Sequence, residues 1–305
     1  MPRPLPVVAV VGPTAAGKSD LAVELARRRG GEVVNADAMQ LYRGMDIGTA
    51  KPTTAQQRGV PHHLLDVLDV TQTATVAEFQ HLARAAVDRC RAEAVVPVLV
   101  GGSALYVRAV LDRFEFPGTD PAVRERLEDE LAAVGAPALH ARLSAVDPAA
   151  AAAILPTNGR RVVRALEVVE LTGRPFSATL PSKMYAYDGA VQIGLDVPRD
   201  LLDQRIEARV GRMWEAGFVD EVRRLEPGLR QGRTAARALG YAQVLAFLAG
   251  ESSEQEARER TVRATRRFAR RQDSWFRKDP RIAWLPFDAP GLVELALDRS
   301  RWGPP

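Results

Sequence analysis

The chain has 305 residues, of which 46% are hydrophobic, so it can bury the core of one large domain or two smaller ones. It has no run of 18 uncharged apolar residues and no signal-peptide pattern at its start, so we expect a cytoplasmic protein with no membrane association. The net charge is only +4, but residues 191–305 hold 21 basic and 17 acidic side chains, an excess that suits contact with a polyanion or a solvated basic surface.

The predicted elements begin with a buried strand at Val7–Val11, a glycine-containing turn and an amphipathic helix from about Asp20 to Arg29. A second strand covers Glu32–Asn35, a helix Val76–Glu93 and a third strand Val95–Val100. Alternating strands and helices predict an α/β fold, with a parallel sheet covered by helices on both faces.

Pro117-Gly118 interrupts this alternation, and residues 121–172 show helical periodicity with no convincing strand. We therefore expect a P-loop NTPase-like core at residues 1–117 and 191–305, interrupted by a helical insertion at 118–190. After it, the pattern predicts a strand at Val191–Asp196, helices at Leu201–Ala216 and Ser253–Arg277, and a last strand at Ile282–Leu285.

A phosphate-binding loop lies between the first strand and the first helix. The residues that fit G-x-x-x-x-G-K-[ST] are Gly12, Pro13, Thr14, Ala15, Ala16, Gly17, Lys18 and Ser19. Backbone N–H groups at the start of a helix favour anions, Lys18 would bridge phosphate oxygens, and Ser19 would ligate Mg²⁺. The pattern indicates a diphosphate or triphosphate, without specifying a nucleotide.

The acidic residue of this core lies in an unusual place for a kinase. P-loop NTPases carry a magnesium-binding aspartate on a second strand, whereas the strand ending at Val100 is followed by Gly101-Gly102-Ser103. Asp37 instead follows the second strand, and ligands collect at the carboxyl ends of parallel strands. We expect the loop, Asp37 and Ser103 to converge, with Asp37 as general base for a second substrate. The alternative is that Asp37 only caps the following turn.

A long segment then resembles a known family. Asn35–Gln40 and Tyr42–Pro52 look like the signature of bacterial tRNA dimethylallyltransferases, also called tRNA isopentenyltransferases. Further matching segments, from Gly12 to about Arg277, are Pro61–Asp66, Gly101–Tyr106, Arg161–Glu167, Arg237–Tyr241 and Thr265–Gln272. The resemblance implies transfer of dimethylallyl from dimethylallyl diphosphate to the exocyclic amine of the adenosine 3′ of the anticodon in tRNA.

The resemblance also implies roles for individual residues. Asp37 matches the general base, Lys18, Ser19 and the loop amides match the diphosphate cradle, and Arg209 matches the arginine on the leaving group. Ser103 stands where the family usually has threonine, and either hydroxyl can donate to the diphosphate. The matching tRNA contacts are Asp37, Ala38, Met39, Gln40, Arg124, Arg160, Arg161, Val162, Val163, Arg164, Arg237, Ala238, Leu239, Gly240, Tyr241 and Ala242.

Two positions depart from the family pattern, Ala38 where serine is usual and Ala242 where a larger polar residue is frequent. Each departure removes a hydrogen-bonding group that could reach RNA. Three alternatives stay open: an adenylate isopentenyltransferase acting on a free nucleotide, a P-loop small-molecule kinase and a non-catalytic RNA-binding protein. We expect a monomer.

Two remaining patterns concern basic and metal-binding residues. Arg263, Arg266, Arg267, Arg270 and Arg271 recur at helical spacing, which predicts a stripe that faces RNA or solvent. Cys90 is the only cysteine, and the chain has four histidines, so we interpret His62-His63 as turn structure rather than metal ligands.

Overall fold

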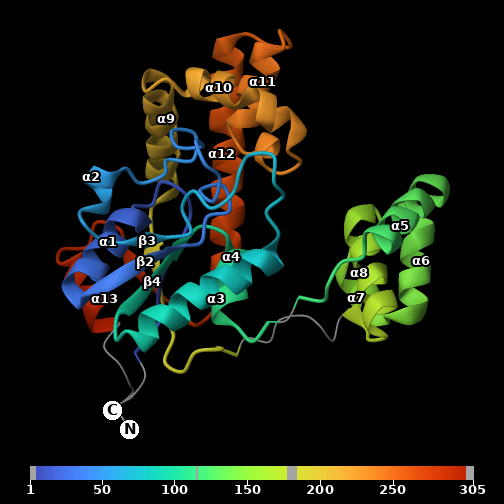
Figure 1. The fold of residues 1–305 in the computed structure, drawn as a ribbon, viewed down its shortest axis with the longest axis horizontal. Helices are drawn as coiled ribbons and strands as arrows, with labels where there is room; N and C mark the ends of the chain where they lie inside the picture. The colour runs from blue at the N-terminus through green and yellow to red at the C-terminus, as the bar shows by residue number, and fades with distance from the viewer. Residues whose placement is uncertain (1–4, 115, 177–183, 300–305) are drawn as a thin grey trace. The chain divides into compact units, whose positions relative to one another are not determined.

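A computed structural model describes residues 5–114, 116–176 and 184–299 (Figure 1). The chain divides into two compact units, one formed by the residues up to Leu111 and from Tyr185 onward, the other by Asp112–Met184. The expected boundaries of the insertion, 117/118 and 190/191, both lie six residues further along the chain than these divisions.

The first unit is built on a parallel sheet, as predicted. Its strands are β1 (Val8–Val11), β2 (Gly31–Asn35), β3 (His62–His63), β4 (Val96–Gly101), β5 (Val191–Asp196) and β6 (Ile282–Pro286), in the order β3-β2-β4-β1-β5-β6. Every pairing is parallel, and Val11 at the end of β1 lies opposite Gly101 at the end of β4. Parallel register brings the carboxyl ends of β1, β2 and β4 to one edge.

The prediction of turn structure at His62-His63 is wrong. The two residues form β3 and pair with Val33 and Val34 of β2. A strand of two residues carries no alternation of polar and apolar positions, so periodicity could not reveal it.

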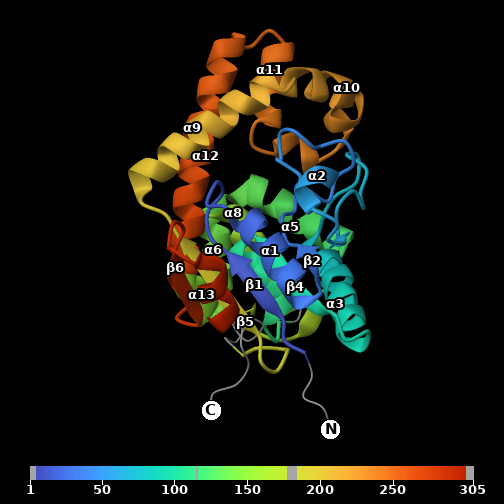
Figure 2. The same cartoon turned by 90° about the vertical axis from the view of Figure 1, so that its left-hand side faces the viewer.

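Alternating residues of β1 supply the cores on the two faces of the sheet. Val8 and Val10 pack with residues of α1 (Lys18–Arg29) and α13 (Leu292–Arg299). Ala9 and Val11 belong to the opposite core, with residues of α3 (Val76–Ala92) and α4 (Ala104–Leu111). Figure 2 shows α1 and α13 in front of the strands and α3 behind them at one edge.

Helices beyond β5 extend the first unit past the carboxyl ends of the strands (Figure 2). They are α9 (Arg199–Glu215), α10 (Phe218–Gln231), α11 (Tyr241–Leu248) and α12 (Glu254–Phe276), with the short 3-10 helix η2 (Ala235–Arg237) before α11. Helix α12 begins at a capping box, in which Ser253 accepts from the N–H of Glu256 and the Glu256 carboxylate accepts from the N–H of Ser253. Helices α9 and α12 match predicted segments, whereas α10, α11 and the short α2 (Thr54–Gln57) were not predicted.

The second unit is helical where the structure describes it. It contains α5 (Pro121–Val134), α6 (Ala136–Val146), α7 (Pro148–Ala153) and α8 (Gly159–Thr172), around a core that includes Leu127, Leu139, Leu143, Val162 and Leu166. Side chains cap three of its helices, Asp120 on α5, Asp147 on α7 and Asn158 on α8. None of the described helices of either unit combines the length and apolarity needed to cross a bilayer.

Candidate active site

The phosphate-binding loop joins β1 to α1. Gly12 and Gly17 have φ of 137° and 97°, values that glycine adopts without steric cost. The Lys18 ammonium donates to the carbonyl of Pro13 across the loop, 2.7 Å away. Burial, and secondarily the Arg209 charge, lower the pKa of Lys18 to about 8, although Asp37 acts in the opposite direction. This poorly solvated cation gains from an incoming anion.

Arg209 reaches the same loop from α9. Its Nη1 donates to Thr14 Oγ1 at 3.2 Å, and its Nη2 donates to the carbonyl of Thr49 at 3.3 Å. Burial lowers the pKa of Arg209, and the nearby Asp37 carboxylate offsets part of that effect. A second cation therefore lies beside the loop, where the family resemblance expects the leaving group.

Asp37 lies just beyond β2 in a hydrogen-bonded turn. Its N–H donates to Asn35 Oδ1, and its own Oδ1 accepts from the N–H of Met39, both at 2.9 Å. The capping interaction considered as an alternative therefore exists, and it fixes the carboxylate. The Asp37 charge acts to raise the pKa of both Lys18 and Arg209, against the effect of burial. Capping and a catalytic role are compatible, since a carboxylate has two oxygens.

Ser103 follows the carboxyl end of β4, next to the loop. A Cβ added to Gly101 would lie 2.6 Å from the carbonyl oxygen of Ala36, so β4 runs close to the residue before Asp37. One added to Gly102 would lie 3.4 Å from the carbonyl oxygen of Gly12. The carbonyl of Ser103 accepts from Val107 N–H and so begins α4. The structure thus brings the loop, the Asp37 segment and the Ser103 segment together at one edge of the sheet.

A cavity of about 720 Å³ opens beside Lys18, Ser19 and Arg209. Arg205 and Arg212, one turn before and after Arg209 on α9, also line it and were not predicted. Part of its wall is apolar, with Ile47, Ala50 and Met213. Several cations beside an apolar surface suit a ligand with a diphosphate at one end and a short hydrocarbon at the other.

The residues present fit Mg²⁺ held with a diphosphate. Ser19 is exposed at the first turn of α1 and lines the cavity. Mg²⁺ keeps several waters and binds through few protein ligands plus substrate phosphates, so one hydroxyl at this point suffices. When bound, the ion would neutralise charge on the leaving diphosphate.

Two buried charged residues behind the site were missed by the sequence reasoning. Glu221 of α10 is 1% exposed and accepts from the N–H groups of Asp46, Ile47 and Gly48 and from the Tyr241 hydroxyl. These bonds hold the turn whose Thr49 carbonyl receives Arg209. The Lys51 ammonium, also buried, lies 2.6 Å from Asp46 Oδ1 and 2.5 Å from Asp66 Oδ1. Nothing local in the sequence distinguishes Glu221 from a surface glutamate.

The tRNA contacts predicted in the first unit have different environments. Ala38, Met39, Leu239 and Ala242 are partly exposed and Arg237 is exposed, whereas Ala238 and Gly240 are buried. Gln40 donates to the carbonyls of Thr49 and Ala50. Tyr241 is fully buried and donates to Glu221, so its side chain supports the segment rather than presenting a surface to RNA.

The tRNA contacts predicted in the second unit lie on α5 and α8. Arg160 and Arg161 are exposed, whereas Val162 and Val163 are buried in the core of the unit. Arg124 and Arg164 both donate to the buried carboxylate of Glu167. Burial alone would raise the pKa of Glu167, but the two guanidinium groups outweigh it and lower that pKa. In this structure Arg124 and Arg164 therefore also have a structural role.

The predicted arginine stripe on α12 divides into two faces. Arg266 pairs with Glu207 at 2.6 Å and Arg270 with Asp203 at 3.3 Å, both on α9, and Arg263 pairs with Glu259 of its own helix. Arg267 and Arg271 are exposed, and no described residue gives them an acidic partner. Arg271 lies over Phe268, and the half-exposed Trp275 follows one turn later. Among the described residues of the predicted stripe, Arg267 and Arg271 are therefore the arginines that a polyanion could reach without breaking an ion pair.

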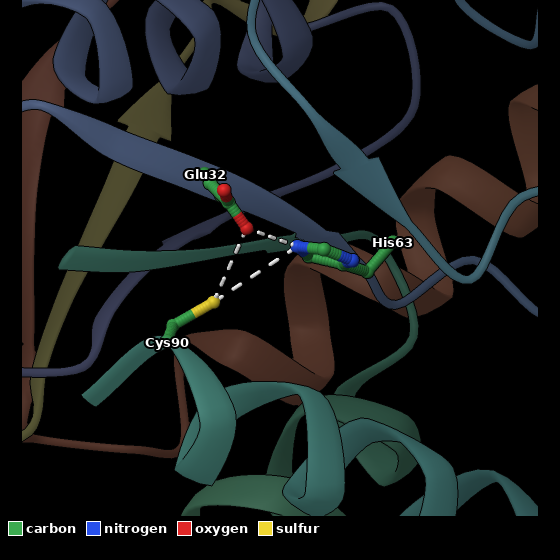
Figure 3. A group of neighbouring side chains, drawn as sticks. All are labelled: Glu32, His63 and Cys90. Atoms are coloured by element: carbon green, nitrogen blue, oxygen red, sulfur yellow. Dashed lines mark hydrogen bonds and ion pairs between the residues drawn. The ribbon is translucent and has the colours of Figure 1, made fainter. Parts of the chain in front are cut away.

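Figure 3 shows a separate cluster of Glu32, His63 and Cys90, from β2, β3 and α3. His63 Nε2 lies 2.5 Å from Glu32 Oε2, and the Cys90 thiol donates to the same oxygen at 3.6 Å. Arg89 Nη2 lies 3.0 Å from His63 Nδ1 and 3.3 Å from His63 Nε2, so a guanidinium cation already lies beside both ring nitrogens. Burial, with help from Glu32, raises the pKa of Cys90 to about 11, so we interpret the cluster as a hydrogen-bonded network.

Comparison with known proteins places this geometry in a family. The sequence model described as IPP transferase matches residues 40–279, and the chain belongs to that family. It is 67% identical over 297 residues to a tRNA dimethylallyltransferase of Thermobifida fusca, covering 95% of this chain and 93% of the relative. A Streptomyces avermitilis protein of the same name is 68% identical over 290 residues, with the same coverage.

Solved structures agree with this placement. A tRNA isopentenylpyrophosphate transferase from Bacillus halodurans is 40% identical, with a TM-score of 0.71, over 97% of this chain and 96% of the other. A eukaryotic dimethylallyltransferase acting on tRNA is 25% identical with a TM-score of 0.82, over 93% of this chain and 74% of the other. The predicted fold class, a P-loop-like α/β core, is confirmed.

Proposed function

We propose that this protein transfers a dimethylallyl group from dimethylallyl diphosphate to the exocyclic amine of the adenosine on the 3′ side of the anticodon in tRNA. The observation that carries the proposal is the position of Asp37, an acid fixed in a turn after β2, at the same edge of the sheet as the phosphate-binding loop that Arg209 contacts through Thr14. An acid there would be repelled by a bound diphosphate unless it serves a second, proton-donating substrate.

The reaction breaks the allylic C–O bond and forms a C–N bond to the adenine. The bonding electrons of the C–O bond leave with the diphosphate, and the proton of the amine passes to Asp37. Charge grows on the leaving group, so Lys18, Arg209 and the loop amides stabilise the transition state more than the ground state. The apolar wall at Ile47, Ala50 and Met213 would receive the dimethylallyl chain and keep water from the carbocation-like carbon.

The adenine of the acceptor must reach Asp37 so that its amine can give up a proton. An adenine in a stacked loop has to leave its stack to enter such a site, and aromatic or apolar side chains lower that cost. The exposed face of α12 offers Arg267, Arg271 and Trp275, a combination that suits phosphates and an unstacked base. The names of the relatives point to the same acceptor. We infer that the protein acts as a monomer, since one chain supplies the loop, Asp37, Ser103 and Arg209. We also infer that it acts in the cytoplasm.

One experiment separates this function from the two enzymatic alternatives. The protein is incubated with Mg²⁺ and dimethylallyl diphosphate plus unmodified tRNA, with the same donor plus AMP, and with ATP plus AMP as a phosphate acceptor. Mass spectrometry should find isopentenyladenosine only in the digested tRNA. Prenylated AMP would instead identify an adenylate isopentenyltransferase, and phosphorylated AMP would identify a kinase. No product in any arm would contradict the proposal.

A further inference from the structure

Gln272 of α12 joins two parts of the site that are distant in sequence. Its Oε1 accepts from the N–H of Thr14 in the phosphate-binding loop at 2.9 Å. Its Nε2 donates to the carbonyl of Gly102, the residue before Ser103, at 2.8 Å. The side chain is 7% exposed, and the amide faces both partners without an intervening residue.

We propose that Gln272 is a positioning residue, which holds the phosphate-binding loop and the Gly102–Ser103 turn at a fixed separation so that one diphosphate contacts both. The inference rests on the proposed function for the identity of the diphosphate. It does not depend on that function for the two hydrogen bonds, which join the loop to the turn whether or not transfer occurs.

The amide is suited to this place because it offers one acceptor and one donor. Thr14 presents an N–H and Gly102 presents a carbonyl, so the bridge needs both kinds of group on one side chain. A carboxylate would set an acceptor against the Gly102 carbonyl, and an ammonium would set a donor against the Thr14 N–H. Of the longer side chains, only an amide or a protonated acid fits.

Glycine at position 102 is consistent with the same close contact. A Cβ there would lie 2.3 Å from Nε2 of Gln272, a separation that real structures do not tolerate. The φ of Gly102 lies outside the left-handed region, so its backbone does not require glycine. A side chain at position 102 would therefore have to displace the end of the Gln272 side chain, and with it the bridge.

The bridge also indicates which backbone N–H groups of the phosphate-binding loop are available to a diphosphate. Because Thr14 N–H is already paired with Gln272, the donors left for a diphosphate begin at Ala15, and Pro13 has no N–H to offer. The anion is thereby placed toward Lys18 and Ser19, at the start of α1. Loss of the bridge should release Thr14 and allow the loop and Ser103 to move apart.

The first test uses Gln272→Met, which keeps the length of the side chain and removes both hydrogen bonds. We expect KM for the donor to rise and kcat to fall, together lowering kcat/KM by about tenfold to a hundredfold, as small displacements of reacting groups do. The matched control is Gln255→Leu, an exposed glutamine of the same helix whose Nε2 donates to Glu259. Parental kcat and KM in Gln272→Met would overturn the proposal.

A second variant gives a readout that a merely structural role would not produce. In Gln272→Glu, the protonated acid reproduces the amide's pattern, because its carbonyl accepts and its hydroxyl donates, whereas the ionised form does not. The ratio of its kcat/KM to that of the parent should therefore rise as the pH falls from 8 to 6. A ratio independent of pH would contradict the bridge, and this test does not require Gln272→Met to fold.

A double-mutant cycle separates this inference from the proposed function. The probe is inorganic diphosphate with Mg²⁺, and its Kd is measured by calorimetry for Gly102→Ala, Gln272→Ala and the double variant. Gly102→Ala should weaken binding in the parent background and have little effect in Gln272→Ala, where the methyl group has room. Additive effects would overturn the bridge. A parent that binds diphosphate and shows this coupling but prenylates no tRNA would contradict the proposed function alone.

Discussion

Arg209 of α9 donates to the Thr14 hydroxyl at 3.2 Å, so a residue 195 positions away along the chain is tied to the first turn of the phosphate-binding loop. Its other Nη group is held by the Thr49 carbonyl. The two contacts orient a partly buried guanidinium toward the place where the diphosphate develops charge. Because the fold already orients the Arg209 guanidinium, no free energy is spent on reorienting it during the reaction.

Arg209→Ala should lower kcat by about 10² to 10³, the loss expected when one preorganised donor to a developing anion is removed. Thr14→Val should have a much smaller effect, because Thr49 still holds the guanidinium. Arg224→Ala, an exposed arginine of α10, serves as the charge-matched control. Steady-state kinetics with saturating tRNA measures all three, and an Arg209→Ala variant with parental kcat would remove Arg209 from the chemistry.

Asp37→Asn distinguishes a general base from a turn cap. Asparagine keeps the side-chain oxygen that accepts from Met39 N–H, so the turn and the melting temperature should be retained. It cannot take the proton of the adenine amine, and single-turnover transfer should slow by about 10² to 10⁴. Binding of tRNA should stay within a few-fold of the parent. If transfer is fast in Asp37→Asn and slow in Asp37→Ala, the residue serves the turn alone.

The convergence of the site could be predicted because each part is local. The phosphate-binding loop is a contiguous pattern, Asp37 and Ser103 follow recognisable strands, and parallel strands bring their carboxyl ends to one edge. The positions of α9 and α12 also followed from periodicity. The partners of the arginines on α12 could not be predicted from periodicity. Arg266 and Arg270 pair with acids of α9, whereas Arg267 and Arg271 do not.

Residues that act through distant partners could not be found in the sequence. Gln272 contacts residues 170 and 258 positions away, and Glu221 contacts a turn 173 to 175 positions away. Their local sequence is that of ordinary amphipathic helices. Such positions become visible only when the fold shows a buried polar group with all its partners, because burial without those partners would be costly.

The charge of Lys18 predicts how donor binding depends on pH. Its pKa is lowered to about 8, mainly by burial, so the free protein loses this proton as the pH rises through 8. The protonated form binds the diphosphate, and the affinity should therefore weaken above pH 8 and level off below it. Lys18→Arg keeps its charge, so its Kd should show only the ionisation of the ligand itself. Calorimetry with dimethylallyl diphosphate from pH 6.5 to 9.5 measures the Kd of the parent and of Lys18→Arg. Parallel profiles would show that Lys18 does not titrate in this range.

Glu221→Gln tests the buried anchor behind Arg209. The parental carboxylate serves four donors, three of them consecutive backbone N–H groups. An amide has one oxygen and turns an NH₂ group toward N–H donors, so the free energy of unfolding should fall by about 1–3 kcal/mol. Tyr241→Phe removes only one bond and should cost about 1 kcal/mol. Urea denaturation measures both, and the exposed Glu251→Gln is the control. Equal stability of Glu221→Gln and parent would mean that the turn does not depend on this carboxylate.

The two faces of α12 predict opposite outcomes for two double variants. Arg267 and Arg271 have no acidic partner among the described residues, so if they neutralise RNA phosphates, each releases counterions on binding. Removing both in Arg267→Ala/Arg271→Ala should flatten the slope of log Kd against log salt by roughly 1.4 to 1.8. The loss should be similar for every tRNA sequence, because phosphate contacts position the RNA without reading it. Donor affinity should not change.

The matched control is Arg266→Ala/Arg270→Ala, which removes the same charge from the same helix. These arginines pair with Glu207 and Asp203, so their loss should lower the melting temperature only slightly and leave the salt slope near that of the parent. Filter binding between 50 and 300 mM salt measures the slopes, and calorimetric melting measures the stability. Equal flattening of the slope in both double variants would show that net charge rather than the exposed face of α12 governs RNA affinity. A parental slope in Arg267→Ala/Arg271→Ala would place the RNA contact elsewhere on the protein.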